Sequence, residues 1–327
     1  MSRRRAFQLA SGIGVGAFLL LIPFILPEIR IHLAIEALIY SLFAISFNVL
    51  FGYGGMLPFG HAGLFGAGAY ATGLIVRYSP ATPLLFILLA TAFFGLLVAL
   101  CIGFFCVRLK GPSFSLCSLA FQMFLFAVAL KWRTVTSGDD GMGITRPDLH
   151  LPFLGEISMR AVPHVYYFTL FVVALGVFCC YLFLKTPLGN SIVCIREREM
   201  RASFLGYNVF ITKLASFLVS GILASLAGGL FALFQEFVGT SFIDLNMGMS
   251  VVIMTVIGGQ AHFLGPVLGA AFYVVLQDWL SSLTSYWMIV MGILFVIIVL
   301  YLEGGLIGLA QKARMWLWTG QPEKADQ

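Results

Sequence analysis

The stretch Lys185–Lys213, KTPLGNSIVCIREREMRASFLGYNVFITK, holds the densest run of charge in the chain, and nearly uninterrupted apolar sequence flanks it on both sides. Five charged side chains fall within positions 196–201. A charge held at the centre of a bilayer costs about 2.5–3.5 kcal/mol or more. The stretch therefore predicts a water-exposed loop, 185–213, between two membrane spans.

Turn and capping residues predict a short helix inside this loop. Pro187 and Gly189 end the preceding span. Asn190 or Ser191 is then placed to cap a new helix by accepting hydrogen bonds from its free N–H groups.

The predicted loop helix is amphipathic. Gly206 suits the left-handed position after its end, and Asn208 is placed to cap the segment that follows. Its apolar side chains recur at helical spacing, at Ile192, Ile195, Ala202 and Leu205. An apolar stripe on a water-exposed loop has to be shielded from water, either by a soluble partner protein or by the membrane surface. The residues leave both interpretations open.

Composition places the whole chain in the membrane. Of 327 residues, 60% are hydrophobic and 10% are charged, and the mean hydropathy is +1.00. A soluble domain of this size could not cover so much apolar surface, so the chain is predicted to be a polytopic membrane protein. The net charge of +5 follows from basic loops and implies no nucleic acid. Six cysteines lie in or near apolar runs without a CxxC pair, which indicates core residues rather than disulfides or metal ligands.

Hydropathy predicts an all-α transmembrane bundle that forms one permease-sized domain, 1–327, with about ten apolar segments of spanning or near-spanning length. They are 11–27, 31–51, 53–76, 84–107, 112–130, 164–184, 214–237, 243–260, 262–281 and 285–303. A cleaved signal peptide is the alternative for the first segment, but no clear small-x-small cleavage site follows Pro27.

The distribution of basic residues orients these segments. Arg3, Arg4 and Arg5 place the N-terminus in the cytoplasm, and alternation from there puts thirteen of the nineteen Lys and Arg residues inside and six outside. Both termini, the 185–213 loop and a tail at 304–327 are then cytoplasmic, while 131–163 is an external loop. Asp139 and Asp140 in that loop lack the ligand spacing of a calcium site.

Two apolar regions are poor continuous helices. Phe51–Tyr70 holds seven glycines, Pro58 and His61. Like it, Val256–Tyr273 has a Gly-Gly pair, passes a His and a Pro, and resumes with a Gly-Ala-rich helix that ends in Tyr. Breaks of this kind expose backbone groups that hydrocarbon does not tolerate, so paired breaks predict a translocation site near mid-membrane. The alternative is that glycines such as Gly63, Gly66 and Gly68 only allow close helix packing.

The candidate residues of the substrate pathway follow from these breaks. They are Asn48, Gly54, Gly55, His61, Gly258, Gly259 and Gln260. For His61 and His262 a structural histidine is the favoured interpretation over a substrate ligand.

Several motifs in order resemble the branched-chain amino-acid ABC permease family, in its LivM-like branch. They are GYGGMLPFGHAGLFGAGAYATGLI, RLKGPSFSLCSLAF, TSGDDGMGI, the run from Pro187 to Ala232, and VIGGQAHFLGPVLGAAFYVVLQDWL. In such permeases a cytoplasmic loop carries Glu-x-x-Ala-x-x-x-Gly, which maps onto Glu199, Ala202 and Gly206. The resemblance implies that this helix couples the permease to an ATP-binding subunit, with Arg196 and Glu197 as further coupling residues.

The resemblance also implies the remaining partners: a second related permease subunit and a periplasmic substrate-binding protein, in a bacterial inner membrane. No G-x-x-x-x-G-K-[ST] motif occurs, so the chain is expected to hydrolyse no ATP and to carry no cofactor, metal or catalytic residue. Branched-chain amino acids are the default substrate, and urea, short amides or other amino acids are the alternative. An ion-coupled secondary transporter or channel would transport alone, and an intramembrane enzyme would need HExxH or GxSxG, which are absent.

Overall fold

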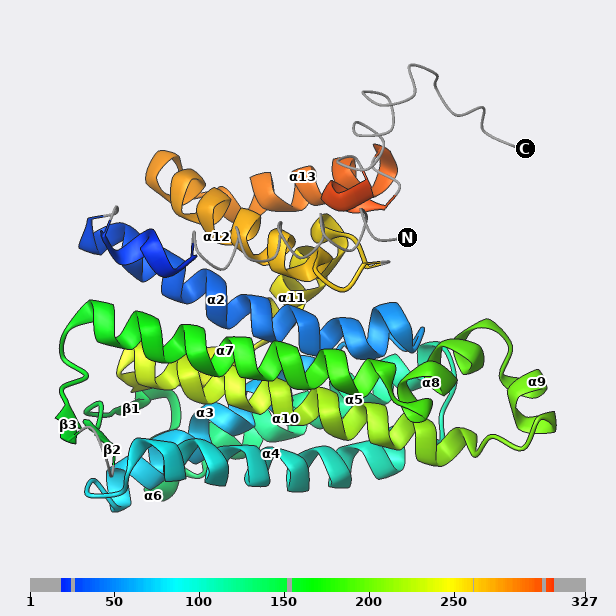
Figure 1. Cartoon of the computed structure of the whole chain (residues 1–327), viewed down its shortest axis with the longest axis horizontal. Helices are drawn as coiled ribbons and strands as arrows, with labels where there is room; N and C mark the ends of the chain where they lie inside the picture. The colour runs from blue at the N-terminus through cyan, green and yellow to red at the C-terminus, as the bar shows by residue number, and fades with distance from the viewer. Residues whose placement is uncertain (1–18, 25–26, 152–154, 261, 302–303, 309–327) are drawn as a thin grey trace, which may run out of the picture.

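The computed structural model describes residues 19–24, 27–151, 155–260, 262–301 and 304–308 (Figure 1). Most of these residues are helical, which confirms an all-α bundle. The longer helices are α2 (Glu28–Asn48), α3 (His61–Tyr78), α4 (Leu84–Cys106), α5 (Pro112–Lys131), α7 (Val162–Lys185), α10 (Val209–Gln235), α11 (Leu245–Gly258), α12 (Gly265–Leu283) and α13 (Trp287–Tyr301). The predicted span 11–27 and tail 304–327 lie largely outside the described residues.

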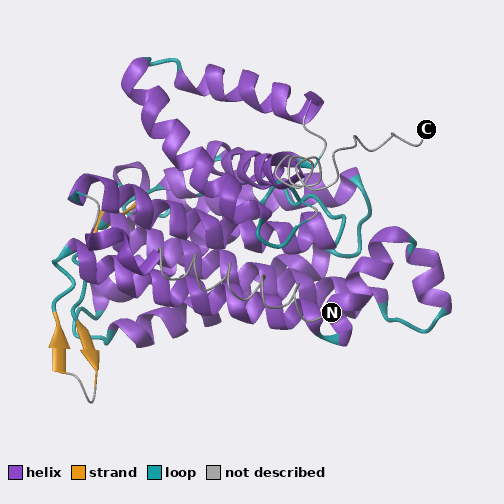
Figure 2. Ribbon diagram, turned by 45° about the horizontal axis from the view of Figure 1, so that its top comes forward, coloured by secondary structure: helices purple, strands orange, loops and turns teal. Residues whose placement is uncertain are grey.

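Shorter elements join these helices. They are the π-helical turn η1 (Val49–Tyr53), α6 (Arg133–Thr136), the 3₁₀ turns η2 (Gly138–Asp140) and η3 (Thr240–Phe242), α8 (Pro187–Glu197), α9 (Glu199–Phe204), and the strands β1 (Met142–Gly143), β2 (Leu149–Leu151), β3 (Gly155–Ile157) and β4 (Phe237–Val238). β1 pairs antiparallel with β4, and β2 with β3 (Figure 2). All strands therefore lie at the ends of long helices.

Length and apolarity mark six helical stretches of the described residues as candidate membrane spans. They are Glu28–Tyr53, Leu84–Cys106, Pro112–Lys131, Val162–Lys185, Val209–Gln235 and Thr240–Gly258. Trp287–Leu300 is a shorter apolar helix. The bundle is thus multi-pass, while the count of about ten segments and the orientation of the termini stay predictions.

Helices α2 and α10 form the centre of the bundle. α10 packs against α2, α3 and α4, and α2 packs against α7, α11 and α12 (Figure 1). The α3–α10 crossing is close because a Cβ at Gly68 would lie 2.0 Å from the Ser225 carbonyl oxygen, and one at Gly228 would lie 1.8 Å from the Phe65 carbonyl oxygen. Gly68 therefore serves helix packing, as small residues do in membrane bundles.

Cysteine placement differs from the sequence expectation. Cys106 and Cys180 are buried, as expected of small core residues, but Cys101, Cys179 and Cys194 are exposed. The apolar helices that carry Cys101 and Cys179 keep many large side chains exposed, including Phe105 and Phe178. On these helices an apolar run marks a surface that meets lipid or a neighbouring subunit, so it does not identify the core.

Both Gly-Gly pairs interrupt the helices, as the sequence predicts. After η1 the chain is irregular from 54 to 60, and α3 begins only at His61, eight residues later than the predicted start at 53. α11 ends at Gly258, and α12 begins at Gly265. The second glycine of each pair has a positive φ, 64° at Gly55 and 104° at Gly259, a backbone conformation that favours glycine.

Arg146 anchors the connection between α5 and α7 to the end of α10. Its guanidinium donates hydrogen bonds to the carbonyl oxygens of Leu233 at 2.8 Å, Phe234 at 3.0 Å and Met159 at 3.0 Å. The last carbonyls of a helix have no partner within the helix, so Arg146 satisfies two of them on α10. Burial lowers the pKa of this guanidinium and Glu236 at 3.5 Å opposes that shift.

Replacing Arg146 by alanine is expected to destabilise the protein by about 3 kcal/mol, because hydrogen bonds to charged groups are worth about 1.5–3 kcal/mol each and some carbonyls regain water. Thermal unfolding of the purified chain in detergent measures the loss. The unfolding temperature of Arg146→Lys should fall between those of the native chain and Arg146→Ala, since an ammonium cannot reach all three oxygens. Arg160→Ala, at an exposed arginine nearby, is the control. Equal unfolding temperatures for Arg146→Ala and Arg160→Ala would contradict the anchoring role.

Candidate functional site

The charged segment 185–213 folds as two short helices joined at one extended residue. α8 runs from Pro187 to Glu197, Arg198 has φ −153° and ψ 93°, and α9 follows from Glu199. Thr186 caps α8, because its hydroxyl accepts a hydrogen bond from the Gly189 N–H at 3.2 Å. The prediction that Asn190 or Ser191 caps this helix is therefore wrong. Proline suits the first helical turn, so α8 already begins at Pro187, which was expected only to end the preceding span.

The end of the segment follows the sequence prediction. Gly206 adopts φ 89°, and its N–H donates to the Ser203 carbonyl oxygen at 3.0 Å. The Asn208 side chain then accepts from the Ile211 N–H at 3.1 Å and caps α10. Both assignments are confirmed.

The chain itself covers most of the predicted apolar stripe. Ile192, Ile195 and Ala202 are 0%, 3% and 2% exposed, respectively, because α8 packs against α7 and α10. Leu205 is 78% exposed and lies beyond the last residue of α9, so the prediction that one helix carries all four side chains is wrong. α9 ends at Phe204, and Leu205 follows it in the turn towards Gly206.

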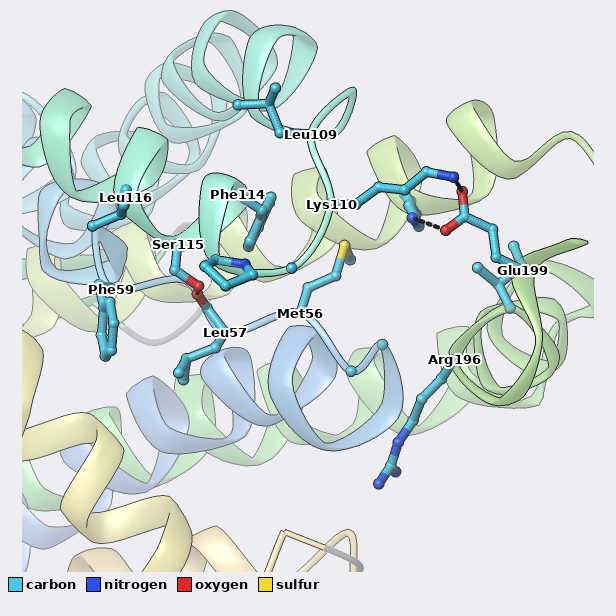
Figure 3. Close-up of a pocket in the computed structure, with 16 residues that line it drawn as sticks. Met56, Leu57, Phe59, Leu109, Lys110, Phe114, Ser115, Leu116, Arg196 and Glu199 are labelled. Carbon is cyan, nitrogen blue, oxygen red and sulfur yellow. Dashed lines mark hydrogen bonds and ion pairs between the residues drawn. The ribbon is translucent and has the colours of Figure 1, made fainter.

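Glu199 ties α9 to the body of the protein. One carboxylate oxygen lies 3.1 Å from the Lys110 ammonium, and the other lies 3.1 Å from the Lys213 ammonium (Figure 3). Burial raises the pKa of Glu199, but hydrogen bonds from both lysines and their positive charges together lower it below its ordinary value. The carboxylate is therefore ionised at neutral pH and holds α9 against the α4–α5 turn and the start of α10.

Arg196 ties α8 to the first break. Its Nη1 donates a hydrogen bond to the Gly52 carbonyl oxygen, 144 positions earlier in the chain. A Cβ at Gly55 would lie 2.8 Å from Cγ of Arg196, so the arginine stem passes directly over this glycine. Arg196 and Glu199 thus both contact their own chain, and Arg196 links the charged segment to the first break.

The outer face of α9 is apolar and uncovered in the described structure. Met200 is 71% exposed, Phe204 is 85% exposed, and Leu205 is 78% exposed. We call these three residues the α9 patch. Sequence reasoning did not single out Met200 and Phe204, although both stand among charges in a water-exposed loop. Of the predicted coupling residues, Glu197 and Gly206 are exposed beside this patch, and Ala202 is buried.

A hollow of about 510 Å³ lies between the charged segment and the first break (Figure 3). The first break contributes Gly54, Gly55 and the apolar residues that follow them, and the α4–α5 turn and α5 form another wall. Arg196 and Glu199 belong to its charged side. The hollow is the largest feature that joins the predicted coupling residues to predicted pathway residues.

The two breaks meet directly. A Cβ at Gly52 would lie 2.6 Å from the Gln260 carbonyl oxygen and 2.1 Å from Oδ1 of Asn48. At the second break, a Cβ at Gly258 would lie 1.9 Å from the Gly265 carbonyl oxygen, and one at Gly259 would lie 2.4 Å from that of Gly304. Through Gly52, the predicted pathway residues Asn48 and Gln260 are therefore brought close together, at the same end of α2 as α8.

Asn48 and His61 lie deep in the core beside this contact. Each is 1% exposed. His61 Nε2 lies 2.8 Å from the Ser46 hydroxyl, and its ring stacks on Phe43 with centroids 5.3 Å apart. Asn48 Oδ1 and His61 Nδ1 have no hydrogen-bond partner among the described residues. The contacts of His61 are those of a histidine packed into the core.

Comparison with known proteins places the chain in a family. Residues 29–299 match the family described as branched-chain amino acid transport system / permease component. The high-affinity branched-chain amino acid transport system permease protein LivM of Salmonella typhimurium is 26% identical over 324 residues, which cover 91% of this chain and 74% of that protein. LivM of Escherichia coli is 26% identical over 310 residues, covering 87% and 71%.

A more distant relative is the guanosine ABC transporter permease protein NupQ of Bacillus subtilis, which is 28% identical over 135 residues and 41% of each chain. No solved structure matches the chain. Permeases of this kind are transport components and not catalysts, and ABC transporter subunits are their partners. The family match spans most of the residues, and the helices are those of a multi-pass membrane protein. This chain therefore belongs to the branched-chain amino acid transport system permease family, as a LivM-like permease of an ABC importer.

Proposed function

We propose that the chain forms half of the membrane pathway of a bacterial importer for leucine, isoleucine and valine. The two LivM proteins that resemble it over most of their length carry this substrate class in their names. A second related permease subunit completes the pathway, and a periplasmic binding protein delivers the substrate to the face that carries the 131–163 loop. The chain spans the inner membrane about ten times, with both termini and the 185–213 loop in the cytoplasm.

A separate ATP-binding subunit drives this importer by docking on the α9 patch. The observation that carries this proposal is the contrast within one short segment. Glu199 is fixed to Lys110 and Lys213, and Arg196 to the Gly52 carbonyl, whereas the α9 patch points outward without cover. A force on the patch is therefore transmitted to the first break. Glu197 and Gly206 border the docking surface, and Arg196, Glu199 and Ala202 hold it to the body.

Alternating access then needs an ATPase that binds the patch differently in its two nucleotide states, since a partner without such a preference shifts no equilibrium. Its motion reaches Gly54 and Gly55 through Arg196, and reaches Gly258, Gly259 and Gln260 through the contact of Gly52 with Gln260. These residues and Asn48 form the proposed translocation site, and His61 lies packed in the core beside them.

Reconstitution in proteoliposomes tests the function. We expect ATP-dependent leucine uptake only when the chain is combined with the second permease, the ATP-binding subunits and the binding protein. Unlabelled isoleucine and valine should compete, whereas urea, acetamide and guanosine should not. Uptake by the purified chain alone would identify a secondary transporter or channel instead, and competition by guanosine or urea would reassign the substrate.

A further inference from the structure

The hollow beside the charged segment has one positively charged side. Lys110, Arg196 and Lys213 line it, and Glu199 is the only acidic residue among its lining residues. Lys110 and Lys213 share Glu199 as their partner, and the Arg196 guanidinium donates to the Gly52 carbonyl oxygen, so the charged lining residues sum to +2. The Lys213 side chain is only 9% exposed, so water screens its charge weakly. This end of the hollow favours an anion.

The start of α5 adds to this positive potential. Gly111 and Pro112 line the hollow, and Gly111 is the N-cap of the 20-residue helix α5. No side chain caps this helix end. Pro112 has no N–H, and the Phe114 N–H donates to the Gly111 carbonyl oxygen at 3.1 Å, so the contribution of this helix end is its dipole, which favours negative charge independently of the lysines and the arginine.

The opposite end of the hollow is apolar. Leu57, Phe59, Phe114 and Leu116 line it. Figure 3 shows Leu57, Phe59 and Leu116 on one side of the hollow, and Lys110, Glu199 and Arg196 on the other. At about 510 Å³ the space lies within the range of small-molecule sites. An inorganic anion would leave this apolar end unfilled.

We propose that this hollow binds a small aliphatic carboxylate from the cytoplasmic side, with the carboxylate between Lys110, Lys213 and the start of α5, and the alkyl tail against Phe59 and Leu116. The transported amino acid is one source of this chemistry, and its deaminated 2-oxo acid is the other. Naming these sources and the cytoplasmic side rests on the proposed function, but the charge and shape of the hollow do not. The walls of the hollow belong to both the first break and the charged segment, so bound carboxylate contacts both. Its affinity therefore depends on the position of the break relative to the charged segment.

Equilibrium dialysis of the full chain in lipid nanodiscs, with radiolabelled 4-methylpentanoate as the probe, tests the site. We expect saturable binding beyond that of empty nanodiscs, and binding at least tenfold weaker for 4-methylpentylamine, which has the same tail and the opposite charge. Lys110→Met should weaken binding of the carboxylate at least fivefold. That lysine is 70% exposed, so the variant is expected to fold.

Two further variants separate the site from general effects. Leu116→Asp, at a side chain 62% exposed, should weaken binding of the carboxylate at least tenfold. Arg160→Met removes a cation just before the start of α7, which is not part of the hollow. This variant should leave binding of the carboxylate unchanged. Equal affinity for the amine, native-like affinity of both pocket variants, or absence of saturable binding would overturn the proposal.

Competition identifies the source of the ligand. Displacement of the probe by leucine points to the transported solute, and displacement by 4-methyl-2-oxopentanoate alone points to its deaminated acid; both results support the site. If neither displaces the probe, or if inorganic phosphate displaces it as well as they do, the proposal fails. The assay contains no ATPase and measures no transport, so its outcome is independent of the reconstitution that tests the proposed function.

Discussion

Replacing Met200, Phe204 and Leu205 together by serine is expected to abolish ATP-driven uptake and to release the ATP-binding subunits during purification. The three side chains are 71%, 85% and 78% exposed in the described chain, so their substitution removes no core packing. Burying one side chain of this size in an interface is worth about 1.5–3 kcal/mol. Losing all three should weaken docking by more than about 100-fold, since each 1.4 kcal/mol is a factor of ten.

Co-purification of tagged chain with the ATP-binding subunits measures this effect, and binding of the isolated subunits to the chain in nanodiscs gives the affinity. Tyr78→Ser is a matched control, because Tyr78 is 64% exposed at the opposite end of the bundle. The unfolding temperature of the triple variant should equal that of the native chain. Native-like co-purification of the triple variant would show that the ATPase docks elsewhere.

Reversing the charge of Glu199 to lysine is expected to reduce uptake to background while ATP hydrolysis by the assembled complex continues. The substitution leaves the buried Lys213 ammonium beside two more cations. Glu199 is 29% exposed, so the pair is only partly buried, and removing one partner costs less than the ~3–5 kcal/mol of a fully buried pair. The exposed Lys110 pair contributes little, since exposed ion pairs are worth about 0–1 kcal/mol. α9 should therefore detach from α10, and a force on the α9 patch should no longer reach the first break.

Uptake and ATP hydrolysis measured on the same proteoliposomes distinguish uncoupling from loss of assembly. The double variant Glu199→Lys with Lys213→Glu restores an opposite-charge pair between α9 and α10, and we expect it to recover most of the uptake. Lys110→Met, which breaks only the exposed pair, should keep the ratio of uptake to ATP hydrolysis near the native value, because Glu199 stays paired with Lys213. Native uptake in Glu199→Lys, or no recovery in the double variant, would contradict a role of this pair in coupling.

Local signals made part of this site predictable from sequence. The density of charge at 196–201 located the loop, and Gly206 and Asn208 carry backbone and capping preferences that act over a few residues. Thr186 was missed because the competing caps Asn190 and Ser191 look equally suitable without knowledge of where α7 ends. Such choices depend on tertiary packing rather than on local preference.

The partners of the charged side chains were not predictable. Arg196 reaches a backbone carbonyl 144 positions away, and a carbonyl oxygen has no sequence signature. Lys110 and Lys213 were placed on the cytoplasmic side by charge bias, but nothing in the sequence distinguishes them from other basic residues as partners of Glu199. The exposure of Leu205 escaped the periodicity argument because the extended Arg198 divides the predicted helix and α9 ends at Phe204.

The contact between Gly52 and the Gln260 carbonyl limits how the pathway opens. No side chain larger than hydrogen fits between them, so neither break has slack to shift by itself. Tightly packed elements of this kind switch between discrete arrangements and do not deform gradually. We therefore expect the two breaks to move together as one unit during transport.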